Sequence, residues 1–108
     1  MKSRINKLEY KVMFNSNKDI LYYKDGLFHR DEDLPAFVRK DGFRGWFKNG
    51  LEHRDKDLPA VIWKDGSRYW FKNGKSHRDN GKPSTIYRNG RMEWYENGKY
   101  IKDNLNEI

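Results

Sequence analysis

Apolar and polar side chains alternate in short runs along this chain, and a turn signal separates each run from the next. The runs are rich in Val, Ile, Phe, Tyr and Trp, which is typical of strands. The separating pairs, the strongest local signal for a hairpin, are Asp25-Gly26, Asp41-Gly42, Asn49-Gly50, Asp65-Gly66, Asn73-Gly74, Asn89-Gly90 and Asn97-Gly98. No segment of about twelve residues without Gly or Pro shows a helical period. The pattern therefore predicts an all-β protein built from antiparallel hairpins.

The whole pattern returns every 24 residues. His-Arg-Asp occurs at 29–31, 53–55 and 77–79, and the prolines are Pro35, Pro59 and Pro83. Within one period we expect strands over 36–40, 43–48 and 51–54, followed by a loop. The predicted units are a degenerate one at 11–34, regular ones at 35–58 and 59–82, and a partial one at 83–106.

Units of this length stack into a one-dimensional array, because a single unit cannot bury its own apolar face. We therefore predict one repeat domain over residues 1–108. Its fold would be an antiparallel meander of tandem 24-residue, three-stranded repeats, with about eleven strands in a single twisted and curled sheet. Such an array favours a binding surface shared by its units over a unique catalytic centre.

If every turn has two residues, the register assigns each side chain to one face of the sheet. Phe37 then lies opposite Trp46, and Trp46 lies opposite His53. Arg39 lies opposite Arg44 on the same face, which we expect to be the binding surface. The equivalent residues of the next unit are Val61, Trp63, Arg68, Trp70 and His77. The other face, expected to form the core, holds Ala36, Val38, Gly45, Phe47 and Arg54. A one-residue shift of register would exchange the two faces.

Composition narrows the class of protein. Charged residues make up 36% of the 108 residues, a proportion that favours disorder. Aromatic residues make up 16%, and their large apolar surfaces can supply the burial that a folded core needs. The net charge of +7 would attract nucleic acid, an anionic membrane or an acidic protein, although such charge also serves ordinary solubility. The absence of cysteine excludes disulfides and thiolate metal sites and favours a reducing cytoplasm. We expect no secretory signal at the start and no membrane span.

One segment carries a resemblance to a known family. Trp46-Phe47-Lys48-Asn49-Gly50-Leu51-Glu52-His53-Arg54, repeated at 70–78, resembles the MORN repeat, although that unit is slightly shorter and usually has Gly after the His. The chain is similar to divergent relatives found in phages, giant viruses and bacteria, and the similarity covers about residues 20–103. The resemblance implies a non-enzymatic scaffold for protein or lipid contacts, and host cytoplasm as its location if a phage encodes it.

The three His-Arg-Asp segments could suggest metal binding or catalysis. Equivalent histidines, however, would stand three strand spacings apart, about 14 Å, which is too far to share an ion. The simpler interpretation is that each His packs on its Trp and bonds the adjacent turn. No Gly-rich loop accompanies the tripeptide as in kinases, and no serine lies in a nucleophile elbow. We therefore expect no catalytic residue, metal or cofactor, and we expect each Arg to pair with a carboxylate of the neighbouring unit.

Tryptophan and arginine supply the candidate contact residues, because both are enriched at protein-binding hot spots. Trp63 opposite Arg68 would bring a guanidinium group near an indole. The alternative is that Trp46, Trp70 and Trp94 belong to the core. The predicted binding residues are Arg39, Arg44, Trp46, His53, Trp63, Arg68, Trp70 and His77.

These residues favour a non-enzymatic binding module that sequesters or inhibits a protein partner. The resemblance suggests a phage-encoded inhibitor of a host defence system. The alternative is nucleic-acid binding through a basic, aromatic sheet face. Anionic lipid is a third and less favoured partner, and open sheet edges could pair with a second copy of the chain.

Overall fold

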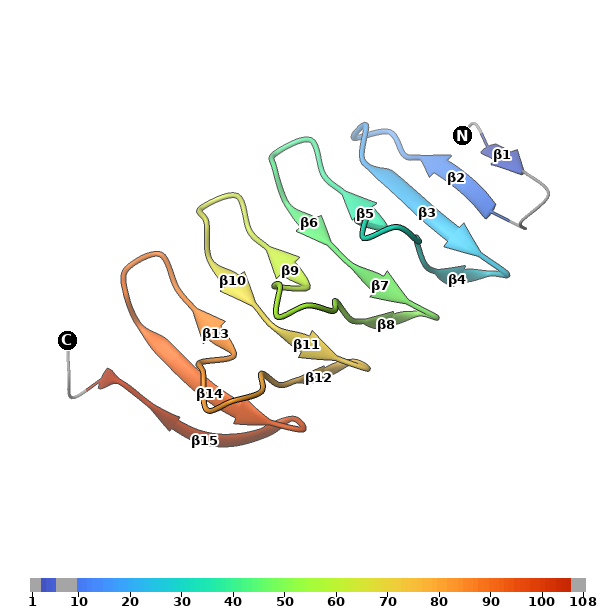
Figure 1. Cartoon of the computed structure of the whole chain (residues 1–108). Coiled ribbons are helices and arrows are strands. Elements are labelled where there is room, and N and C mark those ends of the chain that lie inside the picture. The colour runs from blue at the N-terminus through green and yellow to red at the C-terminus, as the bar shows by residue number, and fades with distance from the viewer. Residues whose placement is uncertain (1–2, 6–9, 106–108) are drawn as a thin grey trace.

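The computed structural model describes residues 3–5 and 10–105 and is all-β. Eleven of the described strands form one open sheet. Their order is β1 (Ser3–Ile5), β2 (Tyr10–Phe14), β3 (Ile20–Lys24), β5 (Phe37–Val38), β6 (Arg44–Gly45), β9 (Val61–Ile62), β10 (Arg68–Tyr69), β13 (Thr85–Ile86), β14 (Met92–Glu96) and β15 (Lys99–Asp103), with β4 (Leu27–Phe28) paired to β3. Two separate hairpins flank it: β7 (Phe47–Lys48) with β8 (Leu51–Glu52), and β11 (Phe71–Lys72) with β12 (Lys75–Ser76). All pairs are antiparallel, so the predicted meander is confirmed (Figure 1).

Two predictions reach beyond the described residues. The chain start, where we expect no secretory signal, lies partly outside them. Residue 106, the predicted end of the fourth unit, also lies outside them. Within residues 3–5 and 10–105, no helix has the length and apolar character needed to cross a membrane.

The middle strand of each regular unit changes its pairing partner at a tryptophan. Trp46 separates β6 from β7: its N–H donates to the Ala60 carbonyl (2.7 Å), and its carbonyl accepts from the His53 N–H (3.0 Å). The chain therefore leaves the main sheet there and continues into its own short hairpin. Trp70 makes the same change 24 residues later, bonding Ser84 (2.7 Å) and His77 (3.1 Å).

The Asn-Gly turns have the expected two-residue form. Asn49 and Gly50 both adopt positive φ, 51° and 85°, and Lys48 pairs with Leu51 across them. These are the features of a type I′ turn, whose twist matches that of the strands it joins.

The turns between β5 and β6 and between their equivalents have a different form. The Arg39 N–H donates to the Phe43 carbonyl (2.9 Å), so three residues, 40–42, lie between the paired positions. Only Gly42 has positive φ there (106°), as in a type I turn followed by a glycine bulge. Turns 64–66 and 88–90 repeat this geometry. In Figure 1 the three-residue turns line one long edge of the sheet, and the two-residue turns line the other.

The extra turn residue makes the predicted face assignment wrong. Phe37 lies opposite Gly45, and not opposite Trp46, while Val38 lies opposite Arg44. Trp46 and Arg44 therefore share a face with Ala36 and Val38, the residues that we had expected to lie behind them.

The predicted proximity of Trp63 and Arg68 fails for the same reason. Arg68 pairs with Ile62, and its guanidinium carbon lies 5.7 Å from the Trp70 ring centre. The spacing of units also needs correction. The main sheet contains two strands per 24 residues, so equivalent positions stand about 10 Å apart and not about 14 Å.

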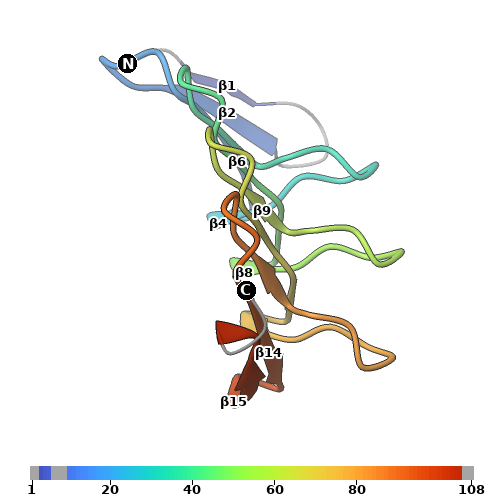
Figure 2. The ribbon, with the colours of Figure 1, turned by 90° about the vertical axis from the view of Figure 1, so that its left-hand side faces the viewer.

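The sheet is a single layer with loops on one side. Figure 2 shows three long loops, which follow β4, β8 and β12, projecting from the same face. Beneath them lies the most buried apolar row, Ala36, Trp46, Ala60 and Trp70. We call this the loop-covered face. The opposite side, the open face, carries Phe37, Phe43, Phe47, Val61 and Trp63 by strand alternation.

Candidate binding surfaces

A clamp of Trp, Arg and Asp joins the loops after β4 and β8 to the sheet. The Arg54 guanidinium carbon lies 3.7 Å from the Trp46 ring centre. Its Nε and Nη2 donate to the two carboxylate oxygens of Asp33 in the preceding loop (2.8 and 3.2 Å). Nη1 donates to the Pro59 carbonyl (3.1 Å), and the Trp46 Nε1–H donates to the Asp33 carbonyl (3.1 Å). The predicted pairing of Arg with a carboxylate of the neighbouring unit is therefore confirmed for Arg54 and Arg78.

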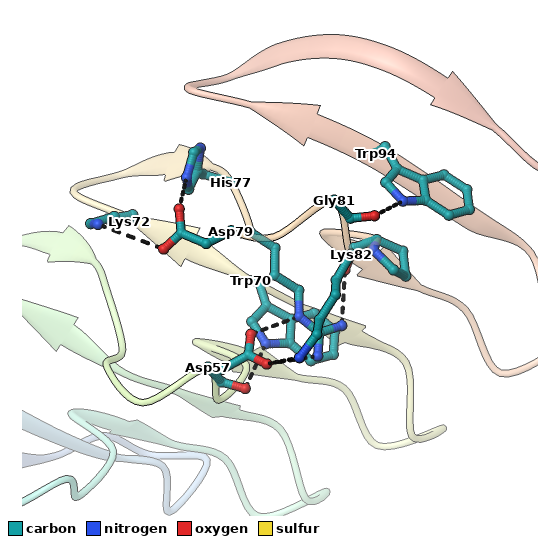
Figure 3. A network of polar contacts seen from close by, with 10 residues as sticks. Asp57, Trp70, Lys72, His77, Asp79, Gly81, Lys82 and Trp94 are labelled. Carbon is teal, nitrogen blue, oxygen red and sulfur yellow. Dashed lines mark hydrogen bonds and ion pairs between the residues drawn. The ribbon is translucent and has the colours of Figure 1, made fainter.

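The same clamp recurs 24 residues later. Arg78 lies 3.9 Å from the Trp70 ring centre and bonds Asp57 through two nitrogens (2.8 and 3.2 Å). Figure 3 shows Asp57 and Trp70 of this second clamp from close by. Lys82 adds a third bond to Asp57 (3.0 Å). The Arg78 hydrogen bonds, followed by that of Lys82, lower the pKa of Asp57 to about 2. The carboxylate therefore stays charged to a lower pH than that of an ordinary Asp.

The clamps bury two of the predicted binding residues, Trp46 and Trp70, so that a partner cannot contact them directly. Trp46 is 7% exposed and Trp70 is 5% exposed. A partner could contact either indole only by displacing the loop above it. The structure thus places these two in the core, as our alternative interpretation had it, while Trp94 stays half-buried beside Lys102 (4.6 Å).

Each histidine uses both ring nitrogens in structural bonds. His53 Nδ1 accepts the backbone N–H of Asn73 (3.1 Å), so the proton of the neutral ring lies on Nε2. Nε2 then donates to Asp55 (2.8 Å), and this bond lowers the pKa of the Asp55 carboxyl. His29 and His77 make the same two bonds.

The histidines therefore connect adjacent units. The predicted bond to an adjacent turn is confirmed, and neither nitrogen is left to act as a base or a ligand. The described residues contain no group of three His, Cys, Asp or Glu side chains placed to hold a metal ion.

The open face carries a contiguous group of aromatic rings. Ring-centre distances of 4.8 Å for Tyr23–Phe28, 5.1 Å for Phe28–Phe47, 6.1 Å for Phe28–Phe37, 5.5 Å for Phe37–Phe43 and 4.7 Å for Phe43–Trp63 link its members. We call this group the aromatic patch: Tyr23, Phe28, Phe37, Phe43, Phe47 and Trp63. All are half-buried except Trp63, which is 42% exposed.

A glycine leaves room for two of these rings close to the backbone. A Cβ added at Gly45 would stand 3.0 Å from the Phe47 ring and 3.5 Å from the Phe43 ring. The next unit has Tyr69 at the position of Gly45 and Ser67 at that of Phe43. This packing of two rings around a glycine is therefore particular to the unit at 35–58.

The predicted binding residues divide between the two faces. Trp63 lies in the aromatic patch, and Arg39 lies at its edge, 5.7 Å from the Phe43 ring centre and ion-paired with Asp41 (3.0 Å). Arg44 and Arg68 are exposed on the loop-covered face. His53, His77, Trp46 and Trp70 are engaged beneath or beside the loops.

Sequence reasoning missed Phe28, Phe43 and Phe47 as surface residues. A signal was present for Phe43, because Phe43 and Gly45 are both replaced by unlike residues in the next unit, but not for Phe47, which Phe71 repeats. Positions that hold the fold keep their residue type in the two central units, as Trp46 and Trp70 do.

Comparison with known proteins adds no relative. No family model matches the sequence, and no curated protein or solved structure matches it significantly. The geometry alone defines the class: an open, single-layer, antiparallel β-sheet protein with loops on one face and aromatic rings on the other.

Proposed function

We propose that this chain is a non-enzymatic binding module whose aromatic patch docks on a protein partner, sequestering that partner or blocking one of its surfaces. The observation that carries the proposal is the patch itself. Six rings meet on the face from which no loop projects, and the largest, Trp63, is 42% exposed. Aromatic residues are enriched at the centres of protein interfaces, where they supply most of the binding energy.

The chemistry of the patch favours a protein over a polyanion. Its members are apolar or phenolic rings, and the guanidinium at its edge, Arg39, is already paired with Asp41. Nucleic acid and anionic lipid need cations that are free to meet phosphate. An apolar ridge on a folded protein would instead bury the rings with little loss of side-chain freedom, since neighbouring rings and Gly45 already fix them.

The histidine geometry supports binding over catalysis, because both nitrogens of each ring are committed to structural bonds. We extend the proposal, from the resemblance to MORN-type repeats, to a phage-encoded inhibitor of a host defence system. A cysteine-free chain suits the reducing host cytoplasm in which such an inhibitor would act.

Site-specific photo-crosslinking tests the docking face. One protein carries p-benzoylphenylalanine in place of Trp63 on the open face, and a control carries it in place of Leu58, an exposed residue of a covering loop. In lysate of cells where the chain acts, we expect a defined protein adduct from position 63 alone. Unlabelled wild type should compete with it, and the double variant Phe43→Ser, Trp63→Gln should not.

Three results would overturn the proposal. They are equal adducts from both positions, an adduct at position 63 that is a second copy of this chain, and an adduct that disappears after nuclease treatment.

A further inference from the structure

A row of unpaired cations follows the long edge of the sheet formed by the three-residue turns. Lys40, Lys64 and Arg88 occupy the first position of three successive turns, and all are exposed. In the part of the chain that the structure describes, none of the three forms an ion pair with a carboxylate. Two acidic residues beside them accept backbone N–H groups of their own turns: Asp41 accepts the Phe43 N–H (3.0 Å), and Asp65 accepts the Ser67 N–H (2.8 Å).

The opposite long edge carries a matching row in which two of the three cations are ion-paired. Lys24, Lys48 and Lys72 precede the two-residue turns. Lys24 pairs with Asp31 (3.5 Å) and Lys72 with Asp79 (4.0 Å). Lys48 forms no ion pair within the described residues; it only helps lower the pKa of Asp55, after the larger effect of His53, just as Arg88 on the turn edge helps lower the pKa of Asp65, after the larger effect of the Ser67 hydrogen bonds. The two rows have the same spacing and the same charge, so they differ chiefly in their local partners.

Two more cations lie on the strands next to the row of Lys40, Lys64 and Arg88. Arg44 and Arg68 occupy equivalent positions on β6 and β10, and both are exposed. Arg44 Nη1 bonds only the Gly42 carbonyl (3.1 Å), which leaves its charge uncompensated. The free edge thus repeats a cluster of positive charge at about 10 Å intervals along a molecule 49 Å long.

A line of charge at a regular interval fits a linear polyanion. We propose that this turn edge, centred on Lys40, Lys64 and Arg88, binds the phosphate backbone of a nucleic acid strand laid along the array. One unit spans about three stacked nucleotides at 3.4 Å each. A membrane fits less well, because turn residues 40–42, 64–66 and 88–90 include no apolar side chain that could enter the lipid. The surface is separate from the aromatic patch and independent of the protein-binding function proposed above.

Titration of labelled oligonucleotides at several salt concentrations tests the proposal. Single strands and duplexes of about 15 nucleotides, the length of the array, distinguish the two forms of nucleic acid. The triple variant Lys40→Gln, Lys64→Gln, Arg88→Gln should bind at least about tenfold more weakly at about 100 mM salt, and its slope of log K against log salt should be smaller by about 2. The control Lys24→Gln, Lys48→Gln, Lys72→Gln removes the same charge from the opposite edge and should bind within about twofold of wild type.

Unfolding curves of both triple variants separate loss of binding from loss of fold. The proposal is supported if only the turn-edge variant loses affinity while both variants stay folded. Equal losses from both variants would overturn it, because net charge alone would then explain binding. Absence of wild-type binding, or binding only to phosphatidylserine vesicles, would also overturn it. The variant Phe43→Ser, Trp63→Gln should keep its affinity for nucleic acid, so this result does not depend on the function of the aromatic patch.

Discussion

The loop-covered face and the open face of the sheet both place guanidinium groups near aromatic rings, but they engage them differently. On the covered face Arg54 lies against Trp46 and also bonds Asp33 and the Pro59 carbonyl. On the open face Arg39 is farther from its ring, 5.7 Å from the Phe43 centre, and pairs with an exposed carboxylate in its own turn.

The comparison shows that the same residue types, aromatic residues and arginine, have different roles on the two faces, depending on whether a loop covers them. Where a loop covers the sheet, an aromatic ring and an arginine become structural. Where no loop projects, rings of the same kind are left half-exposed and can meet another molecule. Substitutions on the covered face should therefore weaken the fold, and those on the open face should chiefly weaken binding.

The sharpest test of this division replaces one tryptophan on each face. Trp70→Ala should lower the free energy of unfolding by about 3–5 kcal/mol, because it removes a buried ring together with its contact to Arg78. Trp63→Ala should lower it by about 1 kcal/mol, since that ring is 42% exposed. Urea denaturation measures both. Similar losses from the two substitutions would contradict a division between the faces.

Arginine substitutions sharpen the comparison further. Arg54→Lys keeps the charge but removes the two-pronged bond to Asp33, so we expect a loss of about 1–3 kcal/mol. Arg39→Lys on the open face changes an exposed pair and should cost less than about 1 kcal/mol. Urea unfolding of the two variants at the same pH measures both losses of stability. A larger loss for Arg39→Lys than for Arg54→Lys would contradict the comparison.

Gly45 tests how the open face is held. Gly45→Ala should lower stability by about 1 kcal/mol, because the new Cβ would stand 3.0 Å from the Phe47 ring and must displace it. Aromatic proton shifts of Phe43 and Phe47 should move, while the Trp70 indole signal stays in place. An unchanged Phe47 spectrum would show that the rings do not lie over Gly45.

The smallest expected effect is the response of the clamp to acid. The lowered folded-state pKa of Asp57, about 2 against 3.8, means that its contribution is present above pH 4 and is lost as pH falls toward 2. The carboxylate side chain is 41% exposed, so the contribution should stay below about 1 kcal/mol. Unfolding measured between about pH 5 and pH 2 should show a shallower decline for Asp57→Asn than for wild type. Identical declines would contradict the clamp.

Much of the covered face could be predicted from the sequence, because its bonds follow repeated residues. Strands, hairpins, the Arg–carboxylate pairing and the His bond to a turn all depend on local patterns that recur at Trp46 and Trp70. The side on which these residues lie could not be predicted. Lys24-Asp25-Gly26 forms a two-residue turn and Lys40-Asp41-Gly42 a three-residue turn, although the tripeptide is the same.

The difference comes from pairing beyond the turn. The strands that flank turn 40–42 have second partners, because β5 also pairs with β3 and β6 also pairs with β9. The register of β5 and β6 within this wider sheet leaves three residues in the turn in place of two. At 25–26, β4 pairs only with β3 within the described sheet, so the turn itself sets the register. The extra residue places Phe43 and Phe47 on the same face as Phe37, which forms the aromatic patch. The sequence analysis assumed two-residue turns, so it did not predict this patch.

Fluorine NMR of protein labelled with 5-fluorotryptophan tests the division between the faces most directly. The chain contains four tryptophans, so each indole gives its own signal, assigned by single Trp→Phe substitutions. With a soluble paramagnetic agent, we predict strong broadening of Trp63, weaker broadening of Trp94, and little change at Trp46 and Trp70. Broadening of Trp46 or Trp70 as strong as that of Trp63 would contradict the account.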